Sequence, residues 1–153
     1  SAAKIFSKPP ISFTTKQWIS DDKIVLEISV RPGLKKPHYA LDENGKWQAY
    51  TRINDENVLA HKIQILVWNK QSSPRGIYFS YTDAEKSLID YLLKNNKISL
   101  SRFMRLAHIP GKKAEDILSN FVVMDIIKIN NSKDKTDFSL NSEFDLTTLG
   151  DLL

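Results

Sequence analysis

The sequence predicts an α+β protein made of two modules joined by a short linker. Between residues 11 and 53, apolar runs rich in β-branched and aromatic side chains alternate with turn-forming residues, which is typical of strands. Between residues 81 and 127, apolar residues recur at helical spacing in three segments. A stretch rich in Ser, Pro and Gly separates the two regions and indicates a linker. We therefore assign residues 1–71 to the first module, 72–80 to the linker and 81–153 to the second module.

The first module opens with two predicted strands, over residues 11–18 and 23–31. Ser20-Asp21-Asp22 lies between them and supplies turn chemistry. The second strand ends at Arg31-Pro32-Gly33, because proline cannot donate a hydrogen bond to a β-ladder. Side chains two residues apart point to the same face of a strand. The apolar residues that share one face of this strand are Ile24, Leu26, Ile28 and Val30.

A second hairpin is predicted from residues 37–41 and 46–53, around Asp42-Glu43-Asn44-Gly45. Asn-Gly favours a two-residue type I′ turn, which needs positive φ at both central positions, and a four-residue loop is the alternative. The following segment, 55–71, carries an approximate helical stripe, so we predict a helix with Asp55 as its N-cap.

The second module begins with three predicted helices. The first, over 81–96, opens with a capping box formed by Thr82 and Glu85. The second covers 98–108 with Ser99 as its cap, and the third starts at Lys112 after the turn Ile109-Pro110-Gly111 and ends near Asp125. Two strands complete the module, over 126–130 and 137–141, with a polar loop at 131–136.

This order of elements is that of a winged helix-turn-helix, in which a short turn joins the second and third helices and a β-hairpin follows them. In that fold the first two helices brace the third, which lies in the major groove of DNA. The sequence therefore predicts a C-terminal winged helix-turn-helix over residues 81–153.

Composition limits the classes of function. The chain has 153 residues, of which 41% are hydrophobic and 26% are charged, as expected for a globular protein. It has no cysteine, which excludes disulfides, thiolate zinc sites and a cysteine nucleophile. No apolar run approaches the roughly 18–20 residues of a membrane span, and the N-terminus lacks the order of a signal peptide. We therefore expect a cytoplasmic protein that does not contact membranes.

The net charge of +4 is unevenly distributed along the chain. Residues 1–81 carry 12 cationic and 7 acidic side chains, a charge of +5, whereas residues 82–153 carry 10 and 11, a charge of −1. The basicity lies in the first half.

No residues form a recognisable reaction centre. A zinc site needs three or four convergent ligands, and His38 and His61 have no carboxylate pair at ligand spacing near them. The chain also lacks a Gly-rich phosphate loop of the form G-x-x-x-x-G-K-[ST]. We expect no enzyme activity, cofactor, metal ion or small-molecule ligand, and we interpret the hairpin around His38 as a surface.

Two short motifs carry a resemblance to a known family. Lys36-Pro37-His38-Tyr39, and then Tyr50-Thr51-Arg52 after an acidic turn, resemble the C-terminal half of the Schlafen-type, AlbA-like DNA-binding domain over residues 5–60. In bacteroidete transcriptional regulators of this type, a helix, a linker and a helix-turn-helix follow. The resemblance implies a partial AlbA-like sheet and helix before the winged helix. The family's N-terminal half has no counterpart here, so the chain looks like a C-terminal fragment. In relatives that cut RNA, the catalytic carboxylates lie in that half.

Cationic residues mark the candidate nucleic-acid contacts. From Lys97 to Lys113 there are five Lys or Arg residues and no acid, and helix N-termini there offer N–H groups to phosphate. The second module contributes Lys97, Arg102, Arg105, Lys112, Lys113, Lys133 and Lys135. The first contributes Lys35, Lys36 and Arg52, with Lys46 nearby, although a solvated basic rim is equally compatible with those residues.

Double-stranded DNA is thus the expected partner and transcriptional regulation the expected function. Glu115 and Asp116 lie on the third helix, directly after its lysines, and weaken this interpretation, as does the charge of −1. The alternative is a protein-interaction or dimerisation module of a larger, ATP-binding or nuclease-like Schlafen-type protein. An unpaired strand edge in a partial sheet also predicts a homodimer.

Overall fold

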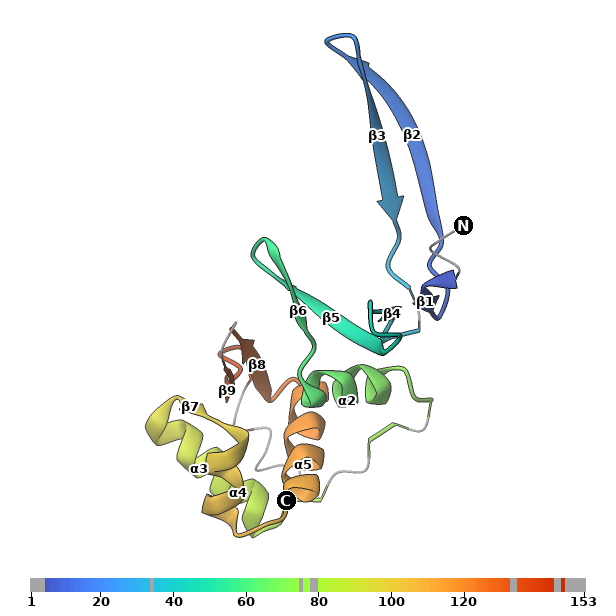
Figure 1. The fold of residues 1–153 in the computed structure, drawn as a ribbon. Helices are drawn as coiled ribbons and strands as arrows, with labels where there is room; N and C mark the ends of the chain where they lie inside the picture. Colours follow the sequence, from blue (N-terminus) through green and yellow to red (C-terminus); the bar gives the residue numbers. More distant parts are fainter. Residues whose placement is uncertain are drawn as a thin grey trace. The chain divides into compact units, whose positions relative to one another are not determined.

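The chain divides between Tyr50 and Thr51 into two units, as described by a computed structural model. The structure describes residues 5–33, 35–74, 76–77, 80–132, 135–144 and 147. Helices and antiparallel sheets are both present, which confirms the α+β class (Figure 1).

The first unit contains a long two-stranded hairpin, β2 (Phe13–Ser20) and β3 (Lys23–Val30). Both strands were predicted from the sequence. They pair in register from Phe13↔Val30 to Ser20↔Lys23, so the connecting loop is only two residues long. Asp21 and Asp22 both have positive φ, 50° and 60°, which is the geometry of a type I′ turn.

A second sheet has the strand order β1-β4-β5-β6. In the first unit it comprises β1 (Ser7–Lys8), β4 (Tyr39–Leu41) and the start of β5 (Trp47–Ile53), which continues past Tyr50. The predicted hairpin of residues 37–41 and 46–53 is therefore present as β4 and β5.

The turn between β4 and β5 differs from both predicted forms. Asp42 N donates to Lys46 O, which leaves three residues in the loop, and Gly45 has φ +74° while Asn44 does not have positive φ. The Asp42 carboxylate selects this geometry, because its Oδ1 accepts from the N–H groups of Asn44 and Lys46 at 2.9 and 2.7 Å. The Lys46 hydrogen bond is also the main cause that lowers the pKa of Asp42.

In the second unit, the predicted helix over 55–71 is wrong in its first third. A turn at Asn54-Asp55, with Asn54 at φ 51°, leads into a strand, β6 (Glu56–Leu59), beside β5. The helix itself, α2, covers Lys62–Gln71, and its N-cap is His61 rather than Asp55. The left-handed turn returns the chain along β5, so Val58 and Leu59 are extended despite their helix-like spacing.

The helix α2 belongs to the second unit, whereas the sequence placed it before a linker at 72–80. Its buried residues Ile63 and Val67 join the core of the second unit and pack against α5 (Gly111–Val123). The division of the chain therefore lies upstream of the segment that Ser72, Ser73 and Pro74 indicated.

Three helices follow in the second unit, close to their predicted positions. α3 (Asp83–Asn95) has the predicted Thr82–Glu85 capping box, and α4 (Leu100–Ala107) is capped by Ser99 Oγ, which accepts from Arg102 N. The third helix, α5, begins directly after the turn at Ile109-Pro110 and ends two residues before Asp125.

A three-stranded sheet completes the unit, in the order β7-β9-β8. β8 (Ile127–Asn131) and β9 (Thr136–Leu140) match the two predicted strands. The two-residue strand β7 (Lys97–Ile98), between α3 and α4, was not predicted.

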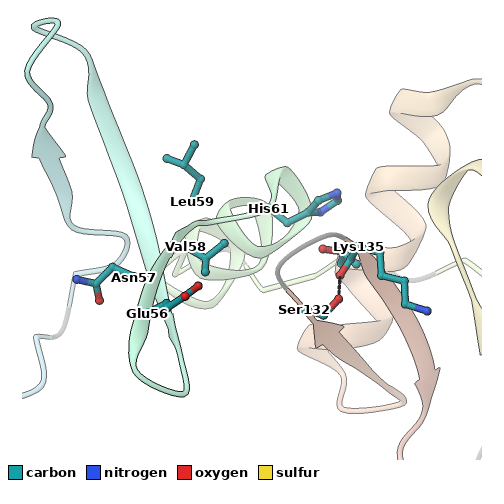
Figure 2. Close-up of a pocket in the computed structure, with 8 residues that line it drawn as sticks. Glu56, Asn57, Val58, Leu59, His61, Ser132 and Lys135 are labelled. Atoms are coloured by element: carbon teal, nitrogen blue, oxygen red, sulfur yellow. Dashed lines mark hydrogen bonds between the residues drawn. The ribbon is translucent and has the colours of Figure 1, made fainter.

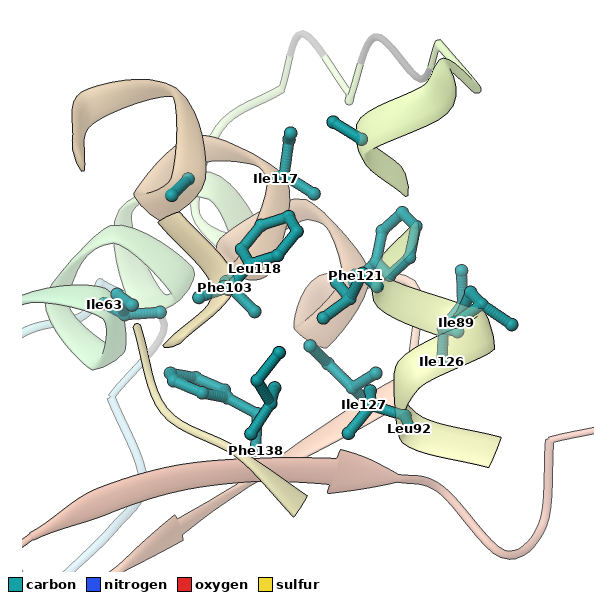
Figure 3. Close-up of a cluster of buried hydrophobic side chains, with 14 of the residues drawn as sticks. Ile63, Ile89, Leu92, Phe103, Ile117, Leu118, Phe121, Ile126, Ile127 and Phe138 are labelled. Carbon is teal, nitrogen blue, oxygen red and sulfur yellow. The ribbon is translucent and has the colours of Figure 1, made fainter. Parts of the chain in front are cut away.

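The hydrophobic core lies where these helices meet the small sheet (Figure 3). Three phenylalanines from α4, α5 and β9 are fully buried in it, namely Phe103, Phe121 and Phe138. Leu88 and Leu92 of α3 are buried in the same cluster, which joins α3 to the helices and sheet that follow it.

Candidate nucleic-acid interface

The helices α4 and α5 are joined by one tight turn, and each helix carries two exposed cations. His108 ends α4 in the left-handed conformation, φ 53° and ψ 41°, and its N–H donates to Met104 O. The chain then passes through Ile109 and Pro110 directly into α5. The cations are Arg102 and Arg105 on α4 and Lys112 and Lys113 in the first turn of α5.

These cations have little to neutralise them. Arg102 and Arg105 are three residues apart, so they lie on one face of α4. The Arg102 guanidinium lies 5.7 Å from the centre of the Tyr91 ring, a contact that holds its position without cancelling its charge. In the part of the chain that the structure describes, neither Arg105 nor the two lysines of α5 form an ion pair.

The two acids on α5 are turned toward α2 and paired there. Lys62 Nζ lies 2.7 Å from the carboxylate of Glu115, whose side chain is only 13% exposed. Lys70 Nζ lies 2.6 Å from the carboxylate of Asp116. The acids that weakened the sequence-based DNA hypothesis are therefore neutralised by lysines of another helix.

Lys70 also anchors α2 along the middle of α5. Its ammonium group donates to Ser119 Oγ at 2.7 Å and to Asn120 Oδ1 at 2.6 Å, in addition to Asp116. Beyond its first turn, α5 has no exposed residue except Asp116 and ends half-buried at Val123. The first turn and Asp116 are therefore the parts of α5 most accessible to a large ligand.

That first turn has no side-chain cap. Thr82 caps α3 and Ser99 caps α4, but the N-cap of α5 is Pro110, whose side chain cannot accept a hydrogen bond. The first intrahelical bonds of α5 go from Lys113 N and Ala114 N to Pro110 O. The N–H groups before them have no intrahelical acceptor and lie beside two lysines in sequence, an arrangement that suits phosphate oxygens.

The remaining candidate cations fall into separate groups. Lys97 and Lys135 each lie 3.9 Å from the Asp137 carboxylate on β9, whose side chain is 13% exposed. Arg52 donates to Asn54 O and Asn57 Oδ1 within the β5–β6 hairpin, with Asp55 3.7 Å away.

The four α4–α5 cations lie on the two helices that flank one turn, and Lys97 and Lys135 share the Asp137 carboxylate. The exposed lysines Lys35 and Lys36 belong to the first unit, as does Lys46 in the β4–β5 turn. Lys133 lies outside the described residues.

One groove involves residues that sequence reasoning did not select. It has a volume of about 660 Å³ and lies between β6 on one side and Ser132, Lys135 and Thr136 on the other (Figure 2). Its lining mixes apolar and polar groups, with Val58 and Leu59 beside Glu56, Ser132 and Lys135. No sequence signal could have found it, because the strand β6 was predicted as helix.

His61 lines this groove but has a structural task. Its Nδ1 accepts from Ile63 N at 3.3 Å and so caps α2, which requires a neutral imidazole. Burial lowers the pKa of His61, and the charge of Glu115 opposes this only in part. The Ser132 hydroxyl donates to Lys135 O. The lining therefore holds no base paired with a nucleophile.

Among the described residues, no three His, Asp or Glu side chains converge as metal ligands. No helix in the described ranges is long and apolar enough to cross a bilayer.

The chain matches no protein-family model, and no curated protein or solved structure shows significant similarity to it. The resemblance to the Schlafen-type, AlbA-like domain thus stays a prediction.

Proposed function

We propose that the second unit contains a winged helix-turn-helix domain that binds double-stranded DNA, and that the chain acts as a transcriptional regulator. The order α3-β7-α4-α5-β8-β9 and the tight turn between α4 and α5 support the fold assignment. In this arrangement α5 takes the place of the recognition helix, and β8 and β9 form the wing.

One observation carries the proposal. The acids of α5 are paired with Lys62 and Lys70, while the cations on both sides of the α4–α5 turn have no acidic partner among the described residues. The charge of −1 for residues 82–153 therefore understates the local positive charge that a phosphate would meet at Lys112 and Lys113.

The covered face of α5 defines the mode of binding. Because α2 covers Glu115 of α5, and Lys70 of α2 holds Asp116 and Asn120, the first turn is the part of α5 best placed to approach the duplex. Cations and free N–H groups at that turn neutralise phosphates but read few base edges. We expect binding with a steep salt dependence and a low preference for sequence.

The test is fluorescence anisotropy of the whole chain with a mixed-sequence duplex at several salt concentrations. Lys112→Ala/Lys113→Ala should weaken binding and reduce the slope of log K against log salt by about 1–2, since each phosphate contact contributes roughly 0.9. Lys86→Ala/Lys94→Ala is the matched control, because it removes two exposed helical lysines from α3. An equal loss in the control would refute specific contact by α5.

A protein-contact role is the second candidate, and the covering of α5 by α2 favours it. Winged helices whose recognition helix is occupied can serve as interaction modules, here within a larger ATP-binding or nuclease-like protein. Absence of duplex binding even at low salt would select this function over DNA binding.

A further inference from the structure

The β2–β3 hairpin has one apolar face and one polar face. Residues paired directly across an antiparallel ladder point to the same side of it. The pairs Phe13↔Val30, Thr15↔Ile28, Gln17↔Leu26 and Ile19↔Ile24 therefore share one face, here called the apolar face. Six of its eight residues are large and hydrophobic, and none is charged.

The opposite face is mostly polar, and Trp18 and Val25, 47% and 49% exposed, are its two large apolar residues. Trp18 Nε1 donates to the Glu27 carboxylate at 2.7 Å, and the Lys16 ammonium lies 3.5 Å from the centre of the Trp18 ring. Ser29 Oγ donates to the other oxygen of Glu27 at 3.3 Å. These contacts form a closed polar network that remains compatible with water.

The apolar face, by contrast, is uncovered within the described residues. Its six large side chains are between 40% exposed, at Phe13, and 84% exposed, at Ile19. Together they expose several hundred Å², the size at which an apolar patch marks an interaction site. A two-stranded ribbon is also marginally stable by itself in water, so burying one face would stabilise the hairpin.

We propose that the apolar face packs against the same face of a second copy of this chain. A symmetric dimer places each residue of a patch against the same patch, so any net charge on the patch would meet its like. This face carries no charge, while Thr15 and Gln17 supply groups that can hydrogen-bond across the interface.

The chemistry of the face argues against nucleic acid as its ligand. It offers no cation to phosphate, and therefore does not suit nucleic acid. Two hairpins packed face to face would form a two-layer sheet with about 10 Å between the layers. The several hundred Å² that these six side chains expose is of the same order as the roughly 800 Å² that each partner contributes to a standard interface. The inference goes beyond the proposed function, because none of these residues belongs to the α4–α5 surface.

Two adjacent positions give a matched test in the full chain. Ile28 lies on the apolar face and Ser29 on the polar face, so Ile28→Lys and Ser29→Lys add the same charge to opposite sides of one strand. Sedimentation velocity should show a concentration-dependent dimer for the unmodified chain. Ile28→Lys should weaken the dimer at least about tenfold, equivalent to roughly 1.4 kcal/mol, and Ser29→Lys should leave it unchanged.

A second test does not require the hairpin to tolerate a lysine side chain. The chain has no cysteine, so single substitutions give clean cross-linking sites. Thr15→Cys lies on the apolar face and Thr14→Cys on the polar face. A bismaleimide with a span of about 10 Å should join two copies through Thr15→Cys and not through Thr14→Cys.

Three results would overturn the proposal. The first is a monomer at concentrations up to about 100 μM, where even weak interfaces associate. The second is a dimer that responds equally to both members of either matched pair. The third is a monomer that binds neutral phosphatidylcholine vesicles and loses this binding with Ile28→Lys, which would assign the apolar face to a lipid surface.

Discussion

Lys70 Nζ lies 2.6 Å from the Asp116 carboxylate and so ties α2 to α5 across 46 residues of sequence. The same ammonium group donates to Ser119 Oγ and Asn120 Oδ1, which makes Lys70 the polar centre of the α2–α5 interface.

Replacing Lys70 should therefore destabilise the second unit. Lys70→Met keeps much of the apolar stem but leaves the oxygens of Asp116 and Asn120 without their donor. We expect a loss of about 1 kcal/mol in the free energy of unfolding, because Ser119 and Asn120 lose a donor in a partly buried site while the 64% exposed Asp116 carboxylate regains water. Chemical denaturation followed by circular dichroism measures it. Lys86→Met, on the exposed face of α3, should change stability by less than about 0.5 kcal/mol.

Asp137 should limit DNA binding, if the proposed function holds. It lies 3.9 Å from both Lys97 and Lys135 and holds these cations back from phosphate. Asp137→Asn should tighten duplex binding and increase the salt slope by about 1–2. Asp125→Asn removes the same charge from an exposed position beyond α5 and serves as control. Unchanged anisotropy curves for Asp137→Asn would exclude the wing from the interface.

The cap of α2 should make stability depend on pH. Burial lowers the pKa of His61 in the folded state, so the unfolded chain binds the proton more readily. The free energy of unfolding should therefore fall as the pH drops below the ordinary value of 6.5 and recover above it. His61→Asn keeps an N-cap acceptor without a titrating group and should flatten this part of the profile.

Asp42 affects the free energy of unfolding at a lower pH than His61 does. Its lowered pKa contributes stability above the ordinary value of 3.8, and that contribution is lost as the pH falls further through the folded-state pKa. A profile measured between pH 5 and pH 8 thus isolates His61. If His61→Asn retained the full slope across this range, the cap would not be its source.

The end of α4 offers a stabilising substitution. His108 adopts φ 53° and ψ 41°, a left-handed conformation that costs a side chain roughly 1–2 kcal/mol and glycine almost nothing. His108→Gly should raise the free energy of unfolding by about 0.5–1 kcal/mol, after the greater entropy of the unfolded glycine is subtracted. Ala107→Gly, one residue earlier and still helical, should lower it by about 1 kcal/mol. Thermal unfolding of the two variants should shift in opposite directions.

The sequence predicted those elements whose signals are local. The Thr82–Glu85 capping box, the Ser99 cap and the Asp21-Asp22 turn each depend on side chains within four residues of the backbone they organise. The α+β class and most strand positions follow from such signals.

Elements that depend on distant partners were not predictable in this way. The strand β7 is two residues long and exists because Ile98 pairs with Phe138 of β9, forty residues later. The sequence assigned the helix α2 to the first module, whereas in the structure it belongs to the second unit, because its packing on α5 leaves no trace in the composition of residues 72–80. The candidate nucleic-acid interface shows the same limit. The exposure of Lys112 and Lys113 could be anticipated from the sequence, but the pairing of Glu115 with Lys62, 53 residues away, could not.

The covering of α5 by α2 has a consequence for regulation. Any event that detaches α2, whether a ligand, a modification of Lys70 or a partner that captures the helix, would leave the carboxylates of Glu115 and Asp116 without their lysines, one turn from Lys112 and Lys113. Such coupling is reciprocal. An anion bound at that turn should therefore keep α2 packed against α5 and slow the exchange of the α2 amide hydrogens. The stability of α2 and the net charge around the first turn of α5 would then depend on each other in a graded manner.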